Sequence, residues 1–205
     1  MEKADSPRVL GIMGSPRRGG NTDLLMDAVL EGAGSAGART EKVYLRDLAI
    51  GPCLGCDRCR KTGECAQKDD MRPLLEKMDS SGAWVLGSPV YYWGPSAQLK
   101  AFVDRWYGAG KIARFDGRPV VLALALGGAA HDARHAVGML VDSLDHQGSV
   151  IVDTVIATGV FAKAEIRLHT GILDMAVKAG RRAAEEAGRR AADPERGSKG
   201  KGGRS

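Results

Sequence analysis

The stretch Arg8–Thr22, RVLGIMGSPRRGGNT, determines the fold class more than any other part of the sequence. It begins with the apolar run Arg8–Met13, which ends at Gly-Ser-Pro and therefore predicts a buried strand followed by a loop. A helix is expected over Asn21–Ala33, because Asn21 or Thr22 can cap it and an apolar stripe follows. The same order of strand, loop and helix recurs along the chain.

Four further strands are expected at Arg39–Leu45, Trp84–Gly87, Pro119–Leu126 and Val150–Ala157, and four further helices at Asp70–Met78, Ser96–Tyr107, His131–His146 and Ala164–Arg190. The strand beginning at Pro119 is almost wholly aliphatic, which indicates burial on both faces, as in a parallel sheet. Strands that alternate with helices predict an α/β fold with helices on both faces of the sheet and right-handed crossovers. Five strands favour the flavodoxin-type order 2-1-3-4-5, with ligands beyond the carboxyl ends of the first and third strands.

The length and composition predict one soluble domain. The chain has 205 residues, of which 43% are hydrophobic and 27% are charged, and this size suits one well-buried domain better than two. No apolar run reaches the length of a membrane span. The segment Met1–Pro7 is polar and lacks a secretory pattern, so we expect a cytoplasmic protein without a membrane partner.

The net charge is concentrated near the C-terminus. The chain carries a formal charge of +5, and six basic and two acidic residues between Arg189 and Ser205 account for most of it. We therefore expect an α/β domain over residues 1–190 and a basic, Gly-rich tail over residues 191–205. A disordered, solvated tail is the favoured interpretation, and an arm that binds nucleic acid is the alternative.

The loop after the first strand, Gly14–Thr22, has the features of an anion site. Backbone N–H groups at a helix N-terminus point toward a ligand there, and glycines allow close approach. Side-chain donors are supplied by Ser15, Asn21, Thr22, Arg17 and Arg18. This loop contains neither the dinucleotide pattern G-x-G-x-x-G nor a Gly-Lys-Ser/Thr sequence, which favours a single terminal phosphate. The alternative is an ordinary polar turn with an Asn or Thr cap.

The loop after the third strand, Gly87–Pro95, contains three aromatic residues in a row, Tyr91, Tyr92 and Trp93. Three adjacent rings cannot all face one core, and they offer flat apolar surface to a planar heterocycle. Backbone donors of Val90–Gly94 can meet the polar edge of such a ring. The alternative is that the rings cover the end of the sheet. Together the two loops predict a mononucleotide that carries a tricyclic ring.

These motifs resemble the NAD(P)H-dependent FMN reductase group of the flavodoxin-like superfamily. The matching segments are Gly14–Thr22, Ser88–Gly94 and Gln98–Arg105, within a resemblance that runs from Val9 to Ala157. The cysteine block, with the Asp69-Asp70-Met71 that follows it, is similar to the iron–sulfur flavoprotein branch of that group.

The resemblance implies the site residues and the activity. The FMN phosphate would be held by Ser15, Arg17, Asn21 and Thr22; the ribityl chain and isoalloxazine by Pro89, Val90, Tyr91, Tyr92, Trp93 and Gly94; and the other side of the ring by Gly127 and Gly128. It also implies a homo-oligomer, a dimer or tetramer. The expected activity is transfer of electrons from NAD(P)H to a quinone, nitroaromatic, azo compound, flavin or metal ion. No catalytic side chain is expected, because the cofactor carries the chemistry. The alternative is an electron-transfer iron–sulfur flavoprotein that serves protein partners, and a nucleic-acid-binding module ranks third.

All four cysteines lie in the loop after the second strand, at Cys53, Cys56, Cys59 and Cys65. Such clustering is unlike a disulfide framework, which spreads cysteines along the chain. Four closely spaced thiolates are what a [4Fe–4S] cluster requires. Four reduced thiols without a metal are an equal alternative. Zinc ranks lower, because its sites usually combine two C-x-x-C pairs held farther apart.

Overall fold

The structure is a computed structural model that describes residues 6–109, 113 and 115–192. Five parallel strands form its sheet in the order β2-β1-β3-β5-β6, namely β2 (Arg39–Tyr44), β1 (Arg8–Met13), β3 (Ala83–Tyr91), β5 (Pro119–Ala125) and β6 (Val150–Ala157). The two-residue β4 (Gly94–Pro95) pairs antiparallel with the end of β3. Counting the parallel strands alone, this is the predicted order 2-1-3-4-5, which is confirmed.

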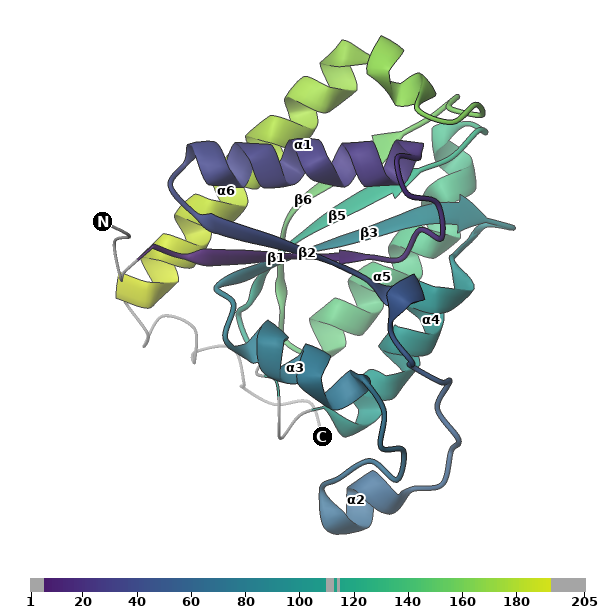
Figure 1. The fold of residues 1–205 in the computed structure, drawn as a ribbon, viewed down its shortest axis with the longest axis vertical. Helices are drawn as coiled ribbons and strands as arrows, with labels where there is room; N and C mark the ends of the chain where they lie inside the picture. The colour runs from purple at the N-terminus through teal and green to yellow at the C-terminus, as the bar shows by residue number, and fades with distance from the viewer. Residues whose placement is uncertain (1–5, 110–112, 114, 193–205) are drawn as a thin grey trace.

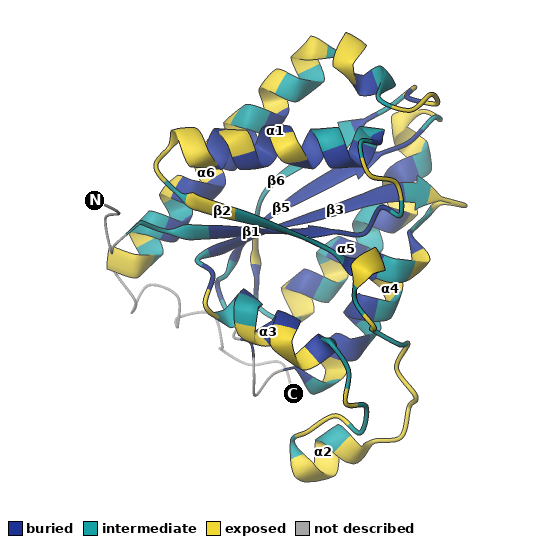
Figure 2. Cartoon of the chain, in the orientation of Figure 1, coloured by how far each residue is buried: buried dark blue, intermediate teal, exposed yellow. Residues whose placement is uncertain are grey.

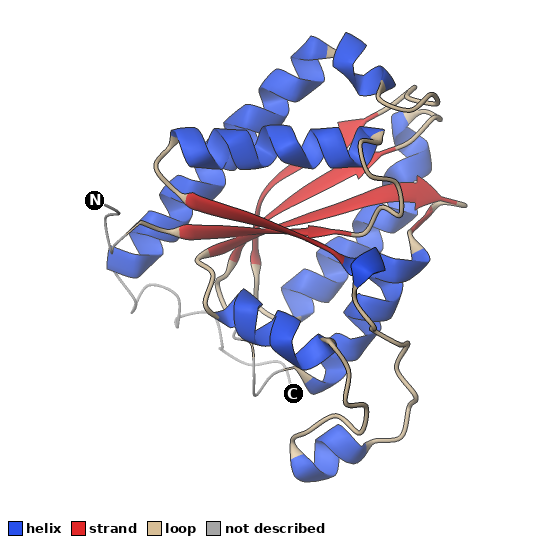
Figure 3. Ribbon diagram, viewed as in Figure 1, coloured by secondary structure: helices blue, strands red, loops and turns tan. Residues whose placement is uncertain are grey.

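Helices cover both faces of the sheet (Figures 1 and 3). One face packs against α1 (Asn21–Ser35) and α6 (Thr170–Ala192), and the other against α3 (Met71–Asp79), α4 (Ala97–Asp104) and α5 (Arg134–His146). Alternate strand residues enter the two cores, so Val9 and Met13 of β1 face one side while Leu10 and Ile12 face the other. The central strands are buried along their length (Figure 2).

Two glycines allow α1 and α6 to pack closely. A Cβ added to Gly180 of α6 would lie 1.8 Å from the carbonyl oxygen of Val29 in α1. A Cβ on Gly32 of α1 would lie 1.9 Å from the carbonyl oxygen of Val177 in α6. The two backbones therefore touch at a point where no side chain fits between them.

Three expectations about element boundaries were wrong. Strand β3 continues through Tyr91 instead of ending at Gly87, because it still pairs with β5 after its pairing with β1 has ended at Gly87. Pro89 is tolerated there, since it lies beyond the part of β3 that pairs with β1. The last expected helix is two elements, a 3₁₀ turn (Glu165–Leu168) and α6, separated at His169.

The third correction concerns the cysteine loop, which contains a short helix, α2 (Arg58–Thr62), between two residues with positive φ, Asp57 and Gly63. Helix α6 extends to Ala192, and the rest of the expected tail lies outside the described residues. None of the helices in the described ranges is both long enough and apolar enough to span a membrane.

Candidate functional site

A cavity of about 310 Å³ lies at the carboxyl ends of β1, β3, β5 and β6. Four loops or strand ends line it, comprising Ser15, Arg17, Gly20, Asn21, Thr22, Pro89, Val90, Tyr91, Ala125, Leu126, Gly127, Gly128, Val160, Phe161, Ala162 and Lys163. This is the position at which open parallel sheets bind ligands, and the volume is within the range of small-molecule sites.

Most of the residues predicted to bind FMN line this one cavity, but Tyr92, Trp93 and Gly94 do not. Tyr92 and Trp93 form the two-residue turn between β3 and β4, with φ of 46° and 63°. Positive φ at both positions is typical of a type I′ hairpin turn. The turn leaves Tyr92 95% exposed, and Trp93 Nε1 donates to Asp132 Oδ1 at 3.4 Å. Tyr91 is the aromatic residue of the three that reaches the cavity.

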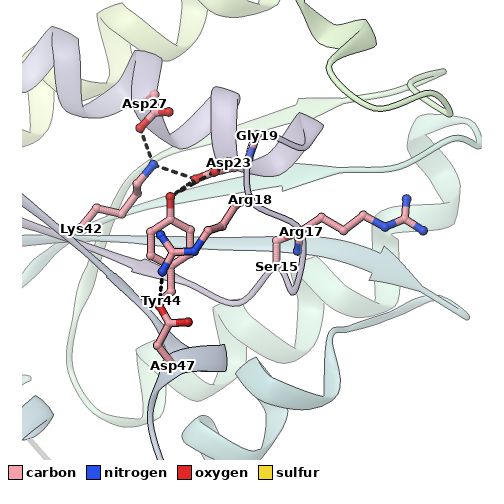
Figure 4. Close-up of polar contacts among 9 residues, drawn as sticks. All are labelled: Ser15, Arg17, Arg18, Gly19, Asp23, Asp27, Lys42, Tyr44 and Asp47. Atoms are coloured by element: carbon pink, nitrogen blue, oxygen red, sulfur yellow. Dashed lines mark hydrogen bonds and ion pairs between the residues drawn. The ribbon is translucent and has the colours of Figure 1, made fainter.

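The charge of the cavity is positive. Its charged lining residues are Arg17 and Lys163, and no Asp or Glu lines it. Among the described residues, neither cation has a carboxylate partner, and the Arg17 side chain extends away from the neighbouring polar cluster (Figure 4). Two cations without a carboxylate partner are suited to bind a negatively charged ligand.

The adjacent Arg18 has a different role. Its guanidinium pairs with Asp47 and lies over the ring of Tyr44, with its central carbon 4.0 Å from the ring centroid (Figure 4). Arg18 is therefore already bound within the protein, although it precedes the same glycines as Arg17.

A buried carboxylate, Asp23, fixes the loop that carries Arg17. Asp23 is 3% exposed and accepts hydrogen bonds from Gly19 N–H at 2.7 Å, Lys42 Nζ at 2.7 Å and Tyr44 Oη at 2.9 Å (Figure 4). Burial opposes the ionisation of Asp23, but these hydrogen bonds outweigh it and hold the pKa of Asp23 below its usual value. Burial likewise opposes the charge of Lys42, yet its bonds to Asp23 and Asp27 raise its pKa.

We expect this network to make stability depend on pH. Because the pKa of Asp23 is lowered in the folded state, its contribution is complete above the ordinary value of 3.8 and is lost as the pH falls through the lowered pKa. The free energy of unfolding, measured with urea between about pH 6 and pH 3, should fall more steeply in the parent than in Asp23→Asn. Equal pH dependence of the unfolding free energy in the two proteins would show that Asp23 titrates alike in the folded and unfolded states.

The Asn21 side chain joins two loops that are far apart in sequence. Its Nδ2 donates to the carbonyl oxygens of Val160 at 3.1 Å and Ala162 at 2.9 Å, and its Oδ1 accepts from Ile166 N–H at 3.1 Å. Both N–H donors of the amide are used in these bonds. We expect Asn21 to position the cavity walls, and any contact it makes with a phosphate to come from its backbone.

The four cysteines lie around a second, much smaller cavity of about 30 Å³, on the loop that extends from the body of the molecule near α2 (Figure 1). Cys53, Cys56 and Cys65 are exposed and Cys59 is partly buried. Within the part of the chain that the structure describes, no three His, Cys, Asp or Glu side chains are grouped to hold a metal ion.

Arg105 connects both ends of this loop. Its side chain is 2% exposed and forms a two-pronged ion pair with Asp69, at 2.7 and 3.0 Å. It also donates to the carbonyl oxygen of Gly51 at 3.0 Å and to Cys65 Sγ at 3.4 Å. Burial opposes the charge of Asp69, but the hydrogen bonds from Arg105 lower its pKa, and the same pair raises the pKa of Arg105. One guanidinium thus closes the base of the cysteine loop.

Residues 7–163 match the protein family described as NADPH-dependent FMN reductase. The chain belongs to this family. The match includes all four walls of the cavity and the cysteine loop.

Relatives of this FMN reductase family member include two iron–sulfur flavoproteins of archaea. One, from Methanocaldococcus jannaschii, is 45% identical over 98 residues, which are 48% of this chain and 51% of the relative. The other, from Archaeoglobus fulgidus, is 43% identical over 98 residues, which are 48% of this chain and 44% of the relative. These matches therefore span about half the length of each relative.

Solved structures support the fold of the FMN reductase family. An NAD(P)H:quinone oxidoreductase from Methanothermobacter marburgensis superposes with a TM-score of 0.69 at 23% identity, covering 86% of this chain and 95% of that one. A flavone reductase superposes with a TM-score of 0.69 at 19% identity, covering 93% of this chain and 65% of the other. The flavodoxin-like fold is confirmed.

FMN and a [4Fe–4S] cluster are the two cofactors expected here, and this structure fits the first better than the second. The 310 Å³ cavity combines an apolar wall, two unpaired cations and a glycine-rich loop, which suits a flavin phosphate ester. The cysteine set has the four thiols of a [4Fe–4S] cluster, but among the described residues no three metal-binding side chains are grouped to hold a metal. As the loop stands in this structure, a cluster does not fit.

Sequence reasoning missed several residues of this FMN reductase site. Residues 160–163 line the cavity from the loop after β6, and Asp23 and Arg105 brace the loops from behind. The signal for Asp23 was weak, because an acidic residue in the first turn of a helix is ordinary. The fifth strand of a flavodoxin-type order ends near the same edge of the sheet, which could have pointed to the loop after β6.

Proposed function

We propose that the protein is an FMN-dependent NAD(P)H oxidoreductase that passes electrons to a small-molecule acceptor such as a quinone, nitroaromatic or flavin. The observation that carries this proposal is a cavity with two unpaired cations and no carboxylate, beside Tyr91, at the carboxyl ends of the central strands. Membership of the NADPH-dependent FMN reductase family supports it.

Different residues of the cavity would bind different parts of FMN. Arg17 offers a forked donor to the phosphate, and the loop held by Asp23 presents backbone N–H groups at the start of α1. Tyr91 and Val90 supply apolar surface, and Gly127 and Gly128 line the same cavity from the end of β5. Bound FMN would supply the chemistry, by accepting a hydride from a reduced nicotinamide and passing electrons on.

The proposal is tested by identifying the cofactor and measuring turnover. Heat-released cofactor should run as FMN on chromatography, and the holoprotein should oxidise NAD(P)H when a quinone is present. Because one cavity must serve donor and acceptor in turn, double-reciprocal plots at several quinone concentrations should be parallel. A protein that stays colourless and cannot be reconstituted with FMN would refute the proposal, and intersecting lines would refute the shared cavity.

The two neighbouring arginines give a matched test of the phosphate site. Arg17→Ala removes an unpaired cation from the cavity, and we expect it to weaken FMN binding by about 1.5–3 kcal/mol, the usual range for a charge-assisted hydrogen bond. Arg18→Ala removes the same charge from a side chain that pairs with Asp47, so it should leave FMN affinity nearly unchanged. The measurement is FMN fluorescence quenching, and equal effects of the two variants would contradict this assignment.

A second candidate function is electron transfer through a cluster held by the four cysteines. The observation that favours it is that all four thiols line one cavity, and relatives named iron–sulfur flavoprotein support it. Because, among the described residues, the thiols are not grouped to hold a metal, the loop must rearrange to hold a cluster. Protein purified without oxygen should then carry about four iron atoms per chain. If protein purified without oxygen holds FMN but no iron, the cluster-based function is excluded and the oxidoreductase without a cluster stands.

We also propose that the chain acts as a homo-oligomer in the cytoplasm. Exposed rings at the rim of the cavity, namely Phe161 at 76%, Tyr92 at 95% and Trp93 at 51% exposure, form the kind of surface that a second copy covers. Light scattering after size-exclusion chromatography should give the mass of a dimer or tetramer, and a monomer at all concentrations would refute this part.

A further inference from the structure

The loop after β6 supplies a wall of the cavity to which no role has been assigned. Val160, Phe161, Ala162 and Lys163 all line the cavity, opposite the ends of β1 and β3. Lys163 reaches back over the glycines of the first loop, since a Cβ added to Gly19 would lie 3.6 Å from Lys163 Cε and 4.0 Å from its Nζ. A cation from late in the sequence is thereby placed beside the loop that carries Arg17.

The backbone of this wall is held by side chains on both sides. Asn21 bonds to the carbonyl oxygens of Val160 and Ala162 and to the N–H of Ile166. Glu165 Oε2 accepts from the N–H groups of Phe161 at 2.6 Å and Ala162 at 2.8 Å. The Phe161 ring also fills the space over Gly127, where a Cβ would come within 2.4 Å of it. The backbone on which Lys163 stands is therefore held in place before any ligand binds.

The charges around Lys163 leave it available to a ligand. Glu165 is used by the loop backbone, no carboxylate lines the cavity, and Lys163 has no ion-pair partner among the described residues. Arg17 is the other cation of the cavity and is equally unpaired. Two unpaired positive charges on separate loops match a phosphate monoester, which carries close to two negative charges at neutral pH.

We infer that Lys163 is a second phosphate-binding residue that acts with Arg17 on the terminal phosphate of the flavin and so makes the site selective for FMN over riboflavin. This inference rests on the proposed function and adds a specificity residue to it. The phosphate would lie between the two loops that Asn21 joins, so loss of the lysine charge should weaken binding of the phosphate ester and not of riboflavin.

The test compares Lys163→Met with Lys178→Met, which removes an exposed lysine of α6 that does not line the cavity. Dissociation constants for FMN and riboflavin are measured by flavin fluorescence on full-length protein freed of flavin. Lys163→Met should weaken FMN binding about tenfold, the lower end for a charge-assisted bond at an exposed site. It should leave riboflavin binding unchanged, and Lys178→Met should match the parent with both ligands.

The possible outcomes distinguish failure of the role of Lys163 from failure of the proposed FMN-dependent function. A parent that binds no FMN would overturn both. A parent that binds FMN, with Lys163→Met binding it equally well or losing FMN and riboflavin alike, would overturn the role of Lys163 alone. A raised KM for NADPH but not NADH, with FMN affinity intact, would assign Lys163 to the phosphate of the nicotinamide donor and likewise overturn the inference. Lys163→Arg, which keeps the charge, should recover most of the affinity for FMN.

Discussion

Gly180→Ala is expected to lower the free energy of unfolding by about 3 kcal/mol, at the upper end of the range for overpacking. The added methyl group would lie 1.8 Å from the carbonyl oxygen of Val29, and backbone cannot move aside as the end of a flexible side chain can. Helices α1 and α6 would have to separate, and buried side chains of both, such as Ala176 and Leu25, would lose contacts in their shared core. Urea unfolding followed by circular dichroism measures the change.

The same helix provides the control. A Cβ added to Gly188 meets nothing within 4 Å, so Gly188→Ala should stabilise the protein by about 0.5–1 kcal/mol through helix propensity alone. The two substitutions have identical chemistry and opposite expected signs. If Gly180→Ala also stabilised the protein, the close approach of the two helices would be wrong.

Arg105→Met should lower the free energy of unfolding by about 3 kcal/mol, because removing one partner of a buried ion pair leaves the other charge uncompensated. Arg105 is almost fully buried and Asp69 retains 15% exposure, so water can partly solvate the orphaned carboxylate. The substitution also frees the carbonyl oxygen of Gly51 and Cys65 Sγ. A protease should therefore cut more rapidly between Cys53 and Cys65 than in the parent.

Arg72→Met is the matched control for Arg105. Arg72 pairs with Glu76 and Glu64, but all three side chains are more than half exposed. Exposed ion pairs contribute about 0–1 kcal/mol, so this variant should unfold like the parent and be cut at the parent's rate. Similar losses in the two variants would mean that burial of Arg105 adds nothing to its role.

The order of the sheet could be predicted because its strands are unambiguous. Pro119–Leu126 is aliphatic at nearly every position, which only burial on both faces explains. The end of β3 could not be predicted, because a proline such as Pro89 ordinarily argues against the interior of a strand. Proline is tolerated at this position only because the pairing of β3 with β1 has already ended, and the sequence does not show where that pairing ends. The break at His169 was hidden for a similar reason, since no proline or glycine precedes it in the 3₁₀ turn.

The site was predictable in so far as its residues belong to the loops after β1, β3 and β5. By residue type Arg17 and Arg18 are equivalent, and the family resemblance alone pointed to Arg17; in the structure the positions of Asp47 and Tyr44 distinguish them. Asn21 was expected to contact the ligand, whereas its side chain joins two loops about 140 positions apart. Contacts at such separations depend on how the strands are arranged, and no local pattern records them.

The residues at the hairpin tip, Tyr92 and Trp93, are not the ones that would make this turn most stable. Left-handed backbone costs a residue with a side chain about 1–2 kcal/mol, and Asn-Gly is the pair that makes such a turn without strain. Two large rings stand there instead, one of them 95% exposed. Proteins need only remain above a stability threshold, so a chain can carry such a local cost. The tip therefore presents apolar ring surface to solvent at the expense of folding stability.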